Sequence, residues 1–214
     1  FNIGNIDFNI DFLNFQEALA FQCYLNEFIY NVSNNETKAL KKLEKTIKLE
    51  LSKGKASINK ILCLASYVPL SNFSWITKVE FTNRFEKLKI FLIKDYITEK
   101  KLFLEIPTLK KINNNFSTKV RKQYEEHPYP RWVSVSLNKD DTILICDMIK
   151  ILKLKIYNES IKKITSPKVL IAGCGTGRQS IEAASLYKNG DILAIDISRK
   201  SLSYAKRKSL ELGY

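Results

Sequence analysis

The sequence predicts an α+β chain, in which an all-helical N-terminal region is followed by the start of a doubly wound α/β domain. Two observations support this fold class. Several segments of the first half have apolar side chains at helical spacing, and residues 168–196 read as strand, glycine-rich turn, helix and strand. We therefore expect a helical region at 1–112, a linker with an aromatic, proline-containing loop at 113–140, and the first part of the α/β domain at 141–214.

The glycine-rich turn lies between two short apolar runs, Val169 to Ala172 and Ile192 to Ile195. Unbroken apolar runs of this length are typical of parallel strands that are buried on both faces. Between them, Arg178 to Lys188 has the apolar spacing of a helix, and Asp196 follows the second run directly. This order is half of a Rossmann-like, nucleotide-binding βαβ unit, in which glycines let a ligand approach the backbone.

The spacing of the glycines narrows the choice of ligand. A dinucleotide-binding turn reads G-x-G-x-x-G, and here Arg178 takes the place of the third glycine, where it would crowd a pyrophosphate. The turn instead reads G-x-G-x-G. Together with Asp196 after the second strand, the stretch from Val169 to Gly177 resembles the cofactor loop of class I S-adenosylmethionine-dependent methyltransferases.

This resemblance implies S-adenosylmethionine as the cofactor. In that family the loop passes under the methionine part of the cofactor, and the acid accepts hydrogen bonds from both ribose hydroxyls. Ile171 stands where many class I enzymes have an acid that contacts the cofactor's amino group, so that contact is not carried over. The implied cofactor-binding residues are Gly173, Cys174, Gly175, Thr176, Gly177, Asp196 and Ile197.

An aromatic loop, Tyr124 to Trp132, precedes the predicted sheet. Its two prolines exclude helix and central strand, so we expect a rigid, extended segment. Gln123 to Trp132 is similar to a Q-Y-E-E-N-P-Y-P-R-W signature in a bacterial branch of class I methyltransferases, often found with tetratricopeptide repeats, although His127 replaces the usual Asn. We predict that Tyr124, Tyr129 and Arg131 form one wall of the cofactor or acceptor pocket. The alternative is a structural plug, in which Tyr129 and Trp132 only bury area.

Four helices are predicted in the N-terminal region from the spacing of apolar residues. The first runs from Phe15 to Tyr30, and Thr37 is the predicted N-cap of the second, which Gly54 closes. Ser57 begins the third, and the fourth extends from Phe81 to Lys100.

Further helices are predicted on either side of the strands. A polar stretch, 113–115, serves as the linker, and Ser117 caps a short helix after it. We expect a helix over Asp141 to Tyr157 that packs against the sheet. A last helix is capped by Ser198 and closed by Gly213, with an inward face of Leu202, Ala205, Ser209 and Leu212.

The composition indicates which general class of protein the chain belongs to. Apolar residues make up 45% of the 214 residues, which excludes wholesale disorder. The 4 cysteines show no metal-binding spacing, so we expect no metal and a reducing, cytoplasmic setting. No apolar run approaches the ~20 residues that a membrane-spanning helix needs. The chain begins with Phe1 and contains only two predicted strands, so we interpret it as part of a longer enzyme, inactive by itself.

The net charge of +13 permits nucleic acid as a substrate without indicating it, because lysines are spread over every predicted helix. We expect a small molecule or a protein as methyl acceptor rather than RNA or DNA, and the sequence identifies no catalytic base. Alternatives are a nucleic-acid-binding methyltransferase, a helical interaction module with a degenerate nucleotide-binding loop and, disfavoured by Arg178, a nucleotide-dependent oxidoreductase. The helical region is the expected site of any protein partner.

Overall fold

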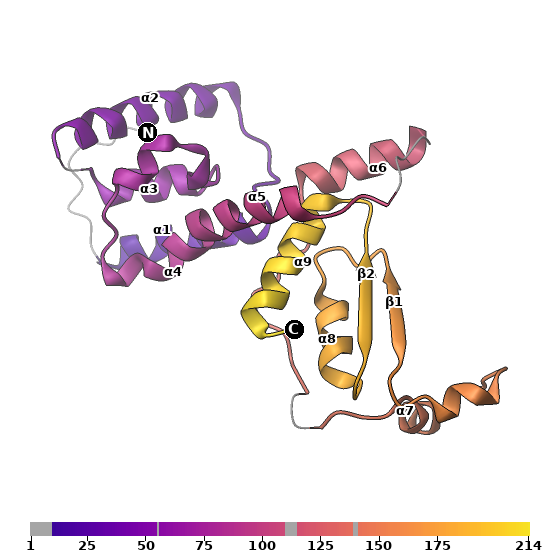
Figure 1. The fold of residues 1–214 in the computed structure, drawn as a ribbon. Coiled ribbons are helices and arrows are strands. Elements are labelled where there is room, and N and C mark those ends of the chain that lie inside the picture. Colours follow the sequence, from indigo (N-terminus) through magenta and orange to yellow (C-terminus); the bar gives the residue numbers. More distant parts are fainter. Residues whose placement is uncertain (1–9, 55, 110–114, 139–140) are drawn as a thin grey trace. The chain divides into compact units, whose positions relative to one another are not determined.

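The computed structural model describes residues 10–54, 56–109, 115–138 and 141–214. In these residues the chain is mostly helical, with a small sheet of two parallel strands (Figure 1). It divides into two compact units between Thr98 and Glu99, within helix α5 (Asp95–Glu105). The expectation of a helical chain with a small parallel sheet is therefore confirmed.

Three helices organise the first unit: α1 (Ile10–Leu25), α2 (Asn34–Ser52) and α3 (Ile58–Ala65). Helix α3 lies between the other two and packs against both (Figure 1). Its buried apolar side chains are part of the core of this unit, and burial of apolar area is the main driving force for folding. The most deeply buried side chains of the core are Tyr24, Ile47, Ile61, Leu62, Leu70 and Leu92.

The bounds of the first two helices differ from the prediction. Helix α1 begins at Ile10 and ends at Leu25 instead of Tyr30, because Glu27 and Phe28 adopt left-handed φ angles of 54° and 56°. The N-cap of α2 is Ser33, not Thr37. Ser33 accepts from the Glu36 amide while the Glu36 carboxylate accepts from the Ser33 amide, a reciprocal pair that Thr37 cannot form.

Gly54 follows the C-cap of α2 with φ of +82°, as predicted for the residue that closes the helix.

The predicted helix over Phe81 to Lys100 is interrupted. A π-helical turn, η4 (Ile90–Lys94), separates α4 (Glu86–Lys89) from α5. The wider turn changes the register, so that the adjacent residues Leu92 and Ile93 are both buried. Short 3₁₀ turns precede it at Leu70–Asn72, Ser74–Lys78 and Asn83–Phe85.

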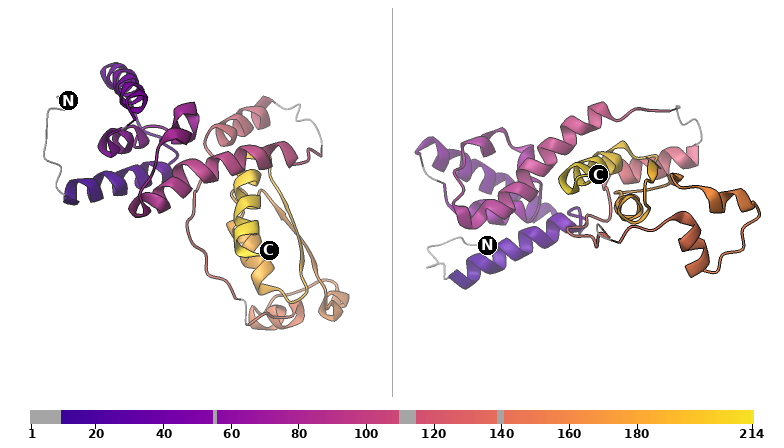
Figure 2. Two further views of the ribbon diagram at one scale, coloured as in Figure 1. Left: turned by 60° about the vertical axis from the view of Figure 1, so that its left-hand side comes forward. Right: turned by 60° about the horizontal axis from the view of Figure 1, so that its bottom comes forward.

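The second unit contains the parallel sheet. Strand β1 (Lys168–Ala172) pairs with β2 (Asp191–Ile195), from Lys168 opposite Asp191 to Ala172 opposite Ile195. Helix α8 (Arg178–Leu186) connects the strands and packs against β2, and α9 (Arg199–Leu212) follows β2 (Figures 1 and 2). Both predicted strands and both predicted helices therefore form. The remaining helices of this unit are α6 (Asn115–Glu126), α7 (Ile145–Ile151) and η5 (Glu159–Lys163).

Four expectations for this unit are wrong in detail. The strands are not buried on both faces, because Leu170 and Leu193 are 60% and 61% exposed. The helix predicted over Asp141 to Tyr157 is reduced to α7, after which Lys153 adopts a left-handed φ of 50°. Helix α6 begins at Asn115, before the predicted cap Ser117, and residues 113 and 114 of the predicted linker lie outside the described residues. The helix continues to Glu126, so Tyr124 to Glu126 are helical and not part of an extended loop, because the first proline comes only at Pro128.

The end signals of α9 are confirmed, but its buried face is not the predicted one. Ser198 caps the helix and Gly213 ends it with φ of 81°. The predicted inward residues are only partly buried. The buried residues of α9 are on another face, and they are Ser201, Ser203, Tyr204, Arg207 and Lys208. None of the described helices is both long enough and apolar enough to cross a bilayer.

Candidate functional site

The glycine-rich turn follows β1 directly and is held by the neighbouring strand. The amides of Gly173 and Cys174 donate to the Ile195 carbonyl of β2, at 2.8 and 3.0 Å. Gly173, Gly175 and Gly177 all have positive φ angles, 73°, 54° and 82°. Because side chains strain this region of backbone conformation, the alternating glycines permit a turn that other residues would resist.

The three glycines face different surroundings. A Cβ atom at Gly173 or Gly175 would have no atom within 4 Å, so these two positions border open space. A Cβ at Gly177 would lie 2.4 Å from the Cβ of Ala205 in α9. Gly177 is therefore required where α8 begins against α9, whereas Gly173 and Gly175 leave room for a ligand at the backbone.

Asp196 joins the turns that follow the two strands. Its Oδ2 accepts from the Gly175 amide and its Oδ1 from the Ser198 amide, both at 2.8 Å. Each carboxylate oxygen has a second lone pair, so Asp196 retains acceptor capacity after making these bonds. The sequence placed Asp196 next to the glycine loop, and the structure brings them together.

Cys174 is a buried thiol inside the glycine loop. Burial, and then the negative charge of Asp196, raise the pKa of Cys174 to about 11. The thiol is therefore protonated at neutral pH, and Cys174 is unsuited to act as a nucleophile.

An open cavity of about 1340 Å³ borders the loop and extends along β2 to Gly190 and Tyr214. It is large enough for a small-molecule ligand. Glycine-loop residues, both tyrosines predicted for the pocket wall and the turn after β2 border it: Gly173, Gly175, Gly177, Tyr124, Tyr129, Asp196 and Ile197.

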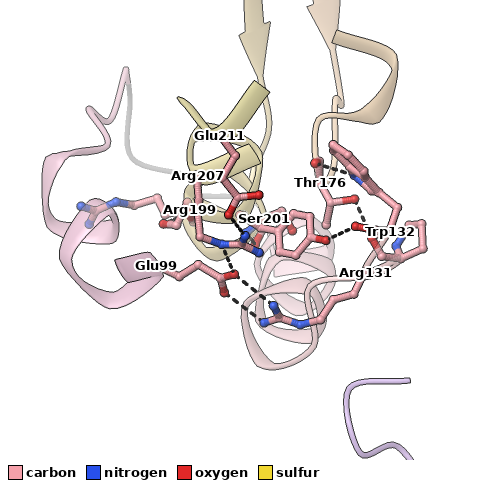
Figure 3. A network of polar contacts seen from close by, with 12 residues as sticks. Glu99, Arg131, Trp132, Thr176, Arg199, Ser201, Arg207 and Glu211 are labelled. Atoms are coloured by element: carbon pink, nitrogen blue, oxygen red, sulfur yellow. Dashed lines mark hydrogen bonds and ion pairs between the residues drawn. The ribbon is translucent and has the colours of Figure 1, made fainter. Parts of the chain in front are cut away.

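Arg131, the third residue predicted for the pocket wall, lies elsewhere. Its guanidinium is buried and forms a two-pronged ion pair with Glu99 of α5, both N–O distances being 3.0 Å. Glu99 also accepts from Arg207 Nε of α9, at 2.9 Å, and Arg207 reaches Glu211 (Figure 3). The helical periodicity gave no sign of this network, because contacts between residues this far apart in sequence leave no local pattern.

The same network includes the glycine loop. Trp132 Nε1 donates to the Thr176 carbonyl at 3.0 Å, and Thr176 Oγ1 donates to the Pro130 carbonyl at 2.7 Å (Figure 3). Trp132 also packs edge-on against Tyr204, with ring centroids 5.9 Å apart. Thr176 is thus a buried residue of the loop, turned toward the 130–132 segment.

Arg178 and the potential metal ligands complete the description of the predicted site. Arg178, predicted to crowd a pyrophosphate, directs its side chain to Glu182 one turn later, with an Nε–Oε1 distance of 3.1 Å. Among the described residues, no group of three His, Cys, Asp or Glu side chains is arranged to hold a metal ion.

Comparison with known families gives one finding. A family model described as a methyltransferase domain matches residues 163–214. The matched segment contains both strands, the glycine loop, Asp196 and α9. Searches of the curated proteins and of the solved structures gave no match. The match supports a methyltransferase, and the helical chain with its small parallel sheet is consistent with part of a Rossmann-like fold.

Proposed function

We propose that the chain is part of an S-adenosylmethionine-dependent methyltransferase, and that the cofactor lies along Gly173 to Gly177 with its ribose hydroxyls on Asp196. The observation that best supports this proposal is the open space at Gly173 and Gly175 beside the Asp196 carboxylate. Both features stand at the carboxyl ends of parallel strands, where α/β sheets bind their ligands.

The residues of the loop suit the proposed cofactor. Asp196 has the remaining lone pairs to accept from two hydroxyls, and its bond to Gly175 holds the carboxylate beside the loop. Ile197 is 39% exposed and lines the cavity, so it offers apolar surface to the adenine ring. Cys174 and Thr176 contribute mainly backbone, because both side chains are buried.

Methyl transfer from S-adenosylmethionine depends mainly on how the protein positions the cofactor. When bound, S-adenosylmethionine supplies a methyl group made transferable by its sulfonium. The chain's part is to hold the cofactor in one orientation and to exclude water from the site. Tyr124 and Tyr129 are suited to the second task, since both border the cavity beside the loop. We assign no catalytic base.

The proposal extends to acceptor and partner. We propose a small molecule or a protein as the methyl acceptor, and the first helical unit as the place where a protein partner binds. The similarity of Gln123 to Trp132 to the Q-Y-E-E-N-P-Y-P-R-W signature supports the bacterial branch named above. Arg131, which we expected at the pocket wall, is better assigned to support of that wall through Glu99.

The test uses the small number of glycines in the chain. Labelling the 7 glycines with ¹⁵N gives a simple amide spectrum in which loop residues can be followed separately. We expect S-adenosylhomocysteine and S-adenosylmethionine to shift the signals of Gly173, Gly175 and Gly177 while those of Gly54 and Gly213 stay in place. NAD at the same concentration is expected to leave all of them unchanged.

Other outcomes support the competing functions. Shifts of the loop signals with NAD alone would indicate a nucleotide-dependent oxidoreductase. No response to any of the three ligands, at concentrations up to the millimolar range, would contradict cofactor binding and support an interaction module.

A further inference from the structure

Two hydrogen bonds connect Thr176 of the glycine loop to the 130–132 segment. Trp132 donates its indole N–H to the Thr176 carbonyl, and Thr176 donates its hydroxyl to the Pro130 carbonyl. Thr176 is 3% exposed and Trp132 is 6% exposed, so water cannot easily replace either bond. Thr176 stands between Gly175 and Gly177. Its position therefore fixes the part of the loop that has the greatest conformational freedom.

The partner of this loop is itself anchored. Arg131, between the two residues that bond to Thr176, is paired with Glu99, and Glu99 is paired with Arg207. Tyr204 of α9 donates its hydroxyl to the Trp132 carbonyl. Removing one partner of a buried ion pair is strongly destabilising, so the pairs with Glu99 oppose displacement of the 130–132 segment.

The turn after β2 is held in the same way, by the end of α6. Ser198 Oγ donates to the Tyr124 carbonyl at 3.0 Å, and the Arg199 amide donates to Glu125 Oε1 at 2.7 Å. Residues 124–132 thus contact both turns at the carboxyl ends of the strands, the one containing Thr176 and the one that follows Asp196.

We propose that residues 124–132 form a positioning segment for the cofactor site, with Trp132 and Thr176 as positioning residues that hold the glycine loop in its binding conformation. The proposal rests on the proposed function for the identity of the ligand. A loop that is only partly in its binding conformation binds its ligand more weakly, in proportion to the fraction that is competent. Removing the Trp132 bond is therefore expected to weaken cofactor binding even though Trp132 itself lies behind the loop.

The experiment compares one substitution at two tryptophans. Trp132→Phe removes the indole donor and keeps an aromatic ring against Tyr204. Trp75→Phe is the matched control, because Trp75 is equally buried, stacks on Phe73, and its Nε1 has no hydrogen-bond partner in the described part of the chain. Both proteins are labelled with ¹⁵N-glycine and titrated with S-adenosylhomocysteine.

For Trp132→Phe we expect shifted or broadened signals from Gly175 and Gly177 before any ligand is added, and a dissociation constant raised about fivefold to tenfold. Trp75→Phe is expected to leave the loop signals and the dissociation constant at their original values. A second pair of variants tests the same contact in case Trp132→Phe does not fold. Thr176→Val removes the bond to Pro130 and should reproduce the effect. Thr176→Ser retains the hydroxyl donor and should give the spectrum of the unmodified protein.

Unchanged loop signals in both Trp132→Phe and Thr176→Val would overturn the positioning role. Equal effects of Trp132→Phe and Trp75→Phe would overturn it as well, because loss of aromatic area would then explain both. The failure of the proposed function looks different: the unmodified protein would not respond to S-adenosylhomocysteine, while the loop signals would still respond to the substitutions.

Discussion

Gly175 donates its amide to Asp196 Oδ2 at 2.8 Å, and this bond connects the two turns that the proposed cofactor site requires. The residues are far apart in sequence but are neighbours because β1 and β2 lie side by side in register. The bond holds the carboxylate next to the positions where a Cβ atom would meet open space.

Asp196→Asn should weaken binding of S-adenosylhomocysteine by about 1–3 kcal/mol, because an ionised acceptor is replaced by a group with one acceptor and one donor end. Calorimetric titration gives the dissociation constant. Asp147→Asn, a change of the same charge in α7, serves as the control and should bind normally. An unchanged constant for Asp196→Asn would remove Asp196 from the proposed site.

Gly175→Val should abolish cofactor binding while the protein remains folded. A Cβ at Gly175 would have no atom within 4 Å, so the branched side chain enters the open space proposed for the ligand, and the positive φ of 54° adds backbone strain. Gly213→Val is the control, because Gly213 also has a positive φ, 81°, and does not border the loop cavity. Normal binding by Gly175→Val would show that the loop does not hold the cofactor.

Gly177→Ala should be destabilising for a different reason. Its φ of +82° is close to the +81° of Gly213, so alanine is strained by a positive φ in both variants. Only at Gly177 would the new methyl group lie 2.4 Å from Ala205. We expect Gly177→Ala to lower the free energy of unfolding by about 1–3 kcal/mol more than Gly213→Ala does, as measured by denaturant titration. Equal losses would mean that α9 moves away at little cost.

The thiol of Cys174 should make stability depend on alkaline pH. Because its folded pKa is raised to about 11, the native state keeps a proton that the unfolded chain releases near pH 9. The contribution is complete below pH 9 and is lost as the pH rises through about 11. Cys174→Ala should lack this part of the decrease. Parallel pH profiles of the two proteins would contradict the prediction.

Tyr129 and Arg131 were both predicted for the pocket wall, but Tyr129 is exposed and Arg131 is buried. The two residues should therefore respond differently to conservative substitution. Tyr129→Phe is expected to reduce the affinity for S-adenosylhomocysteine without changing Tm, because Tyr129 is exposed at the cavity. Arg131→Lys should lower Tm, because lysine cannot form the two-pronged pair with Glu99. Tyr157→Phe, at a fully exposed position, is the control for the tyrosine change. Unchanged affinity in Tyr129→Phe would support the alternative, in which the aromatic loop is a structural plug.

The sequence by itself determined the elements whose signals are local. Strands β1 and β2 follow from short apolar runs, the loop from its alternating glycines, and the ends of α9 from Ser198 and Gly213. The meeting of Asp196 with the glycine loop also followed, since adjacent parallel strands bring their carboxyl ends to one edge. Each of these depends on residues close together in the chain or on a single regular crossover.

Only the tertiary structure decided which faces and partners these elements use. The predicted inward face of α9 consisted of Leu202, Ala205, Ser209 and Leu212. Tyr204 and Arg207 are more deeply buried than these residues, because they contact Trp132 and Glu99. Arg131 was expected at the pocket and instead lies against Glu99. Glu99, Arg131 and Arg207 belong to three separate elements, and no periodicity along one element reports a charge supplied by another. The buried network therefore became visible only once the chain was folded.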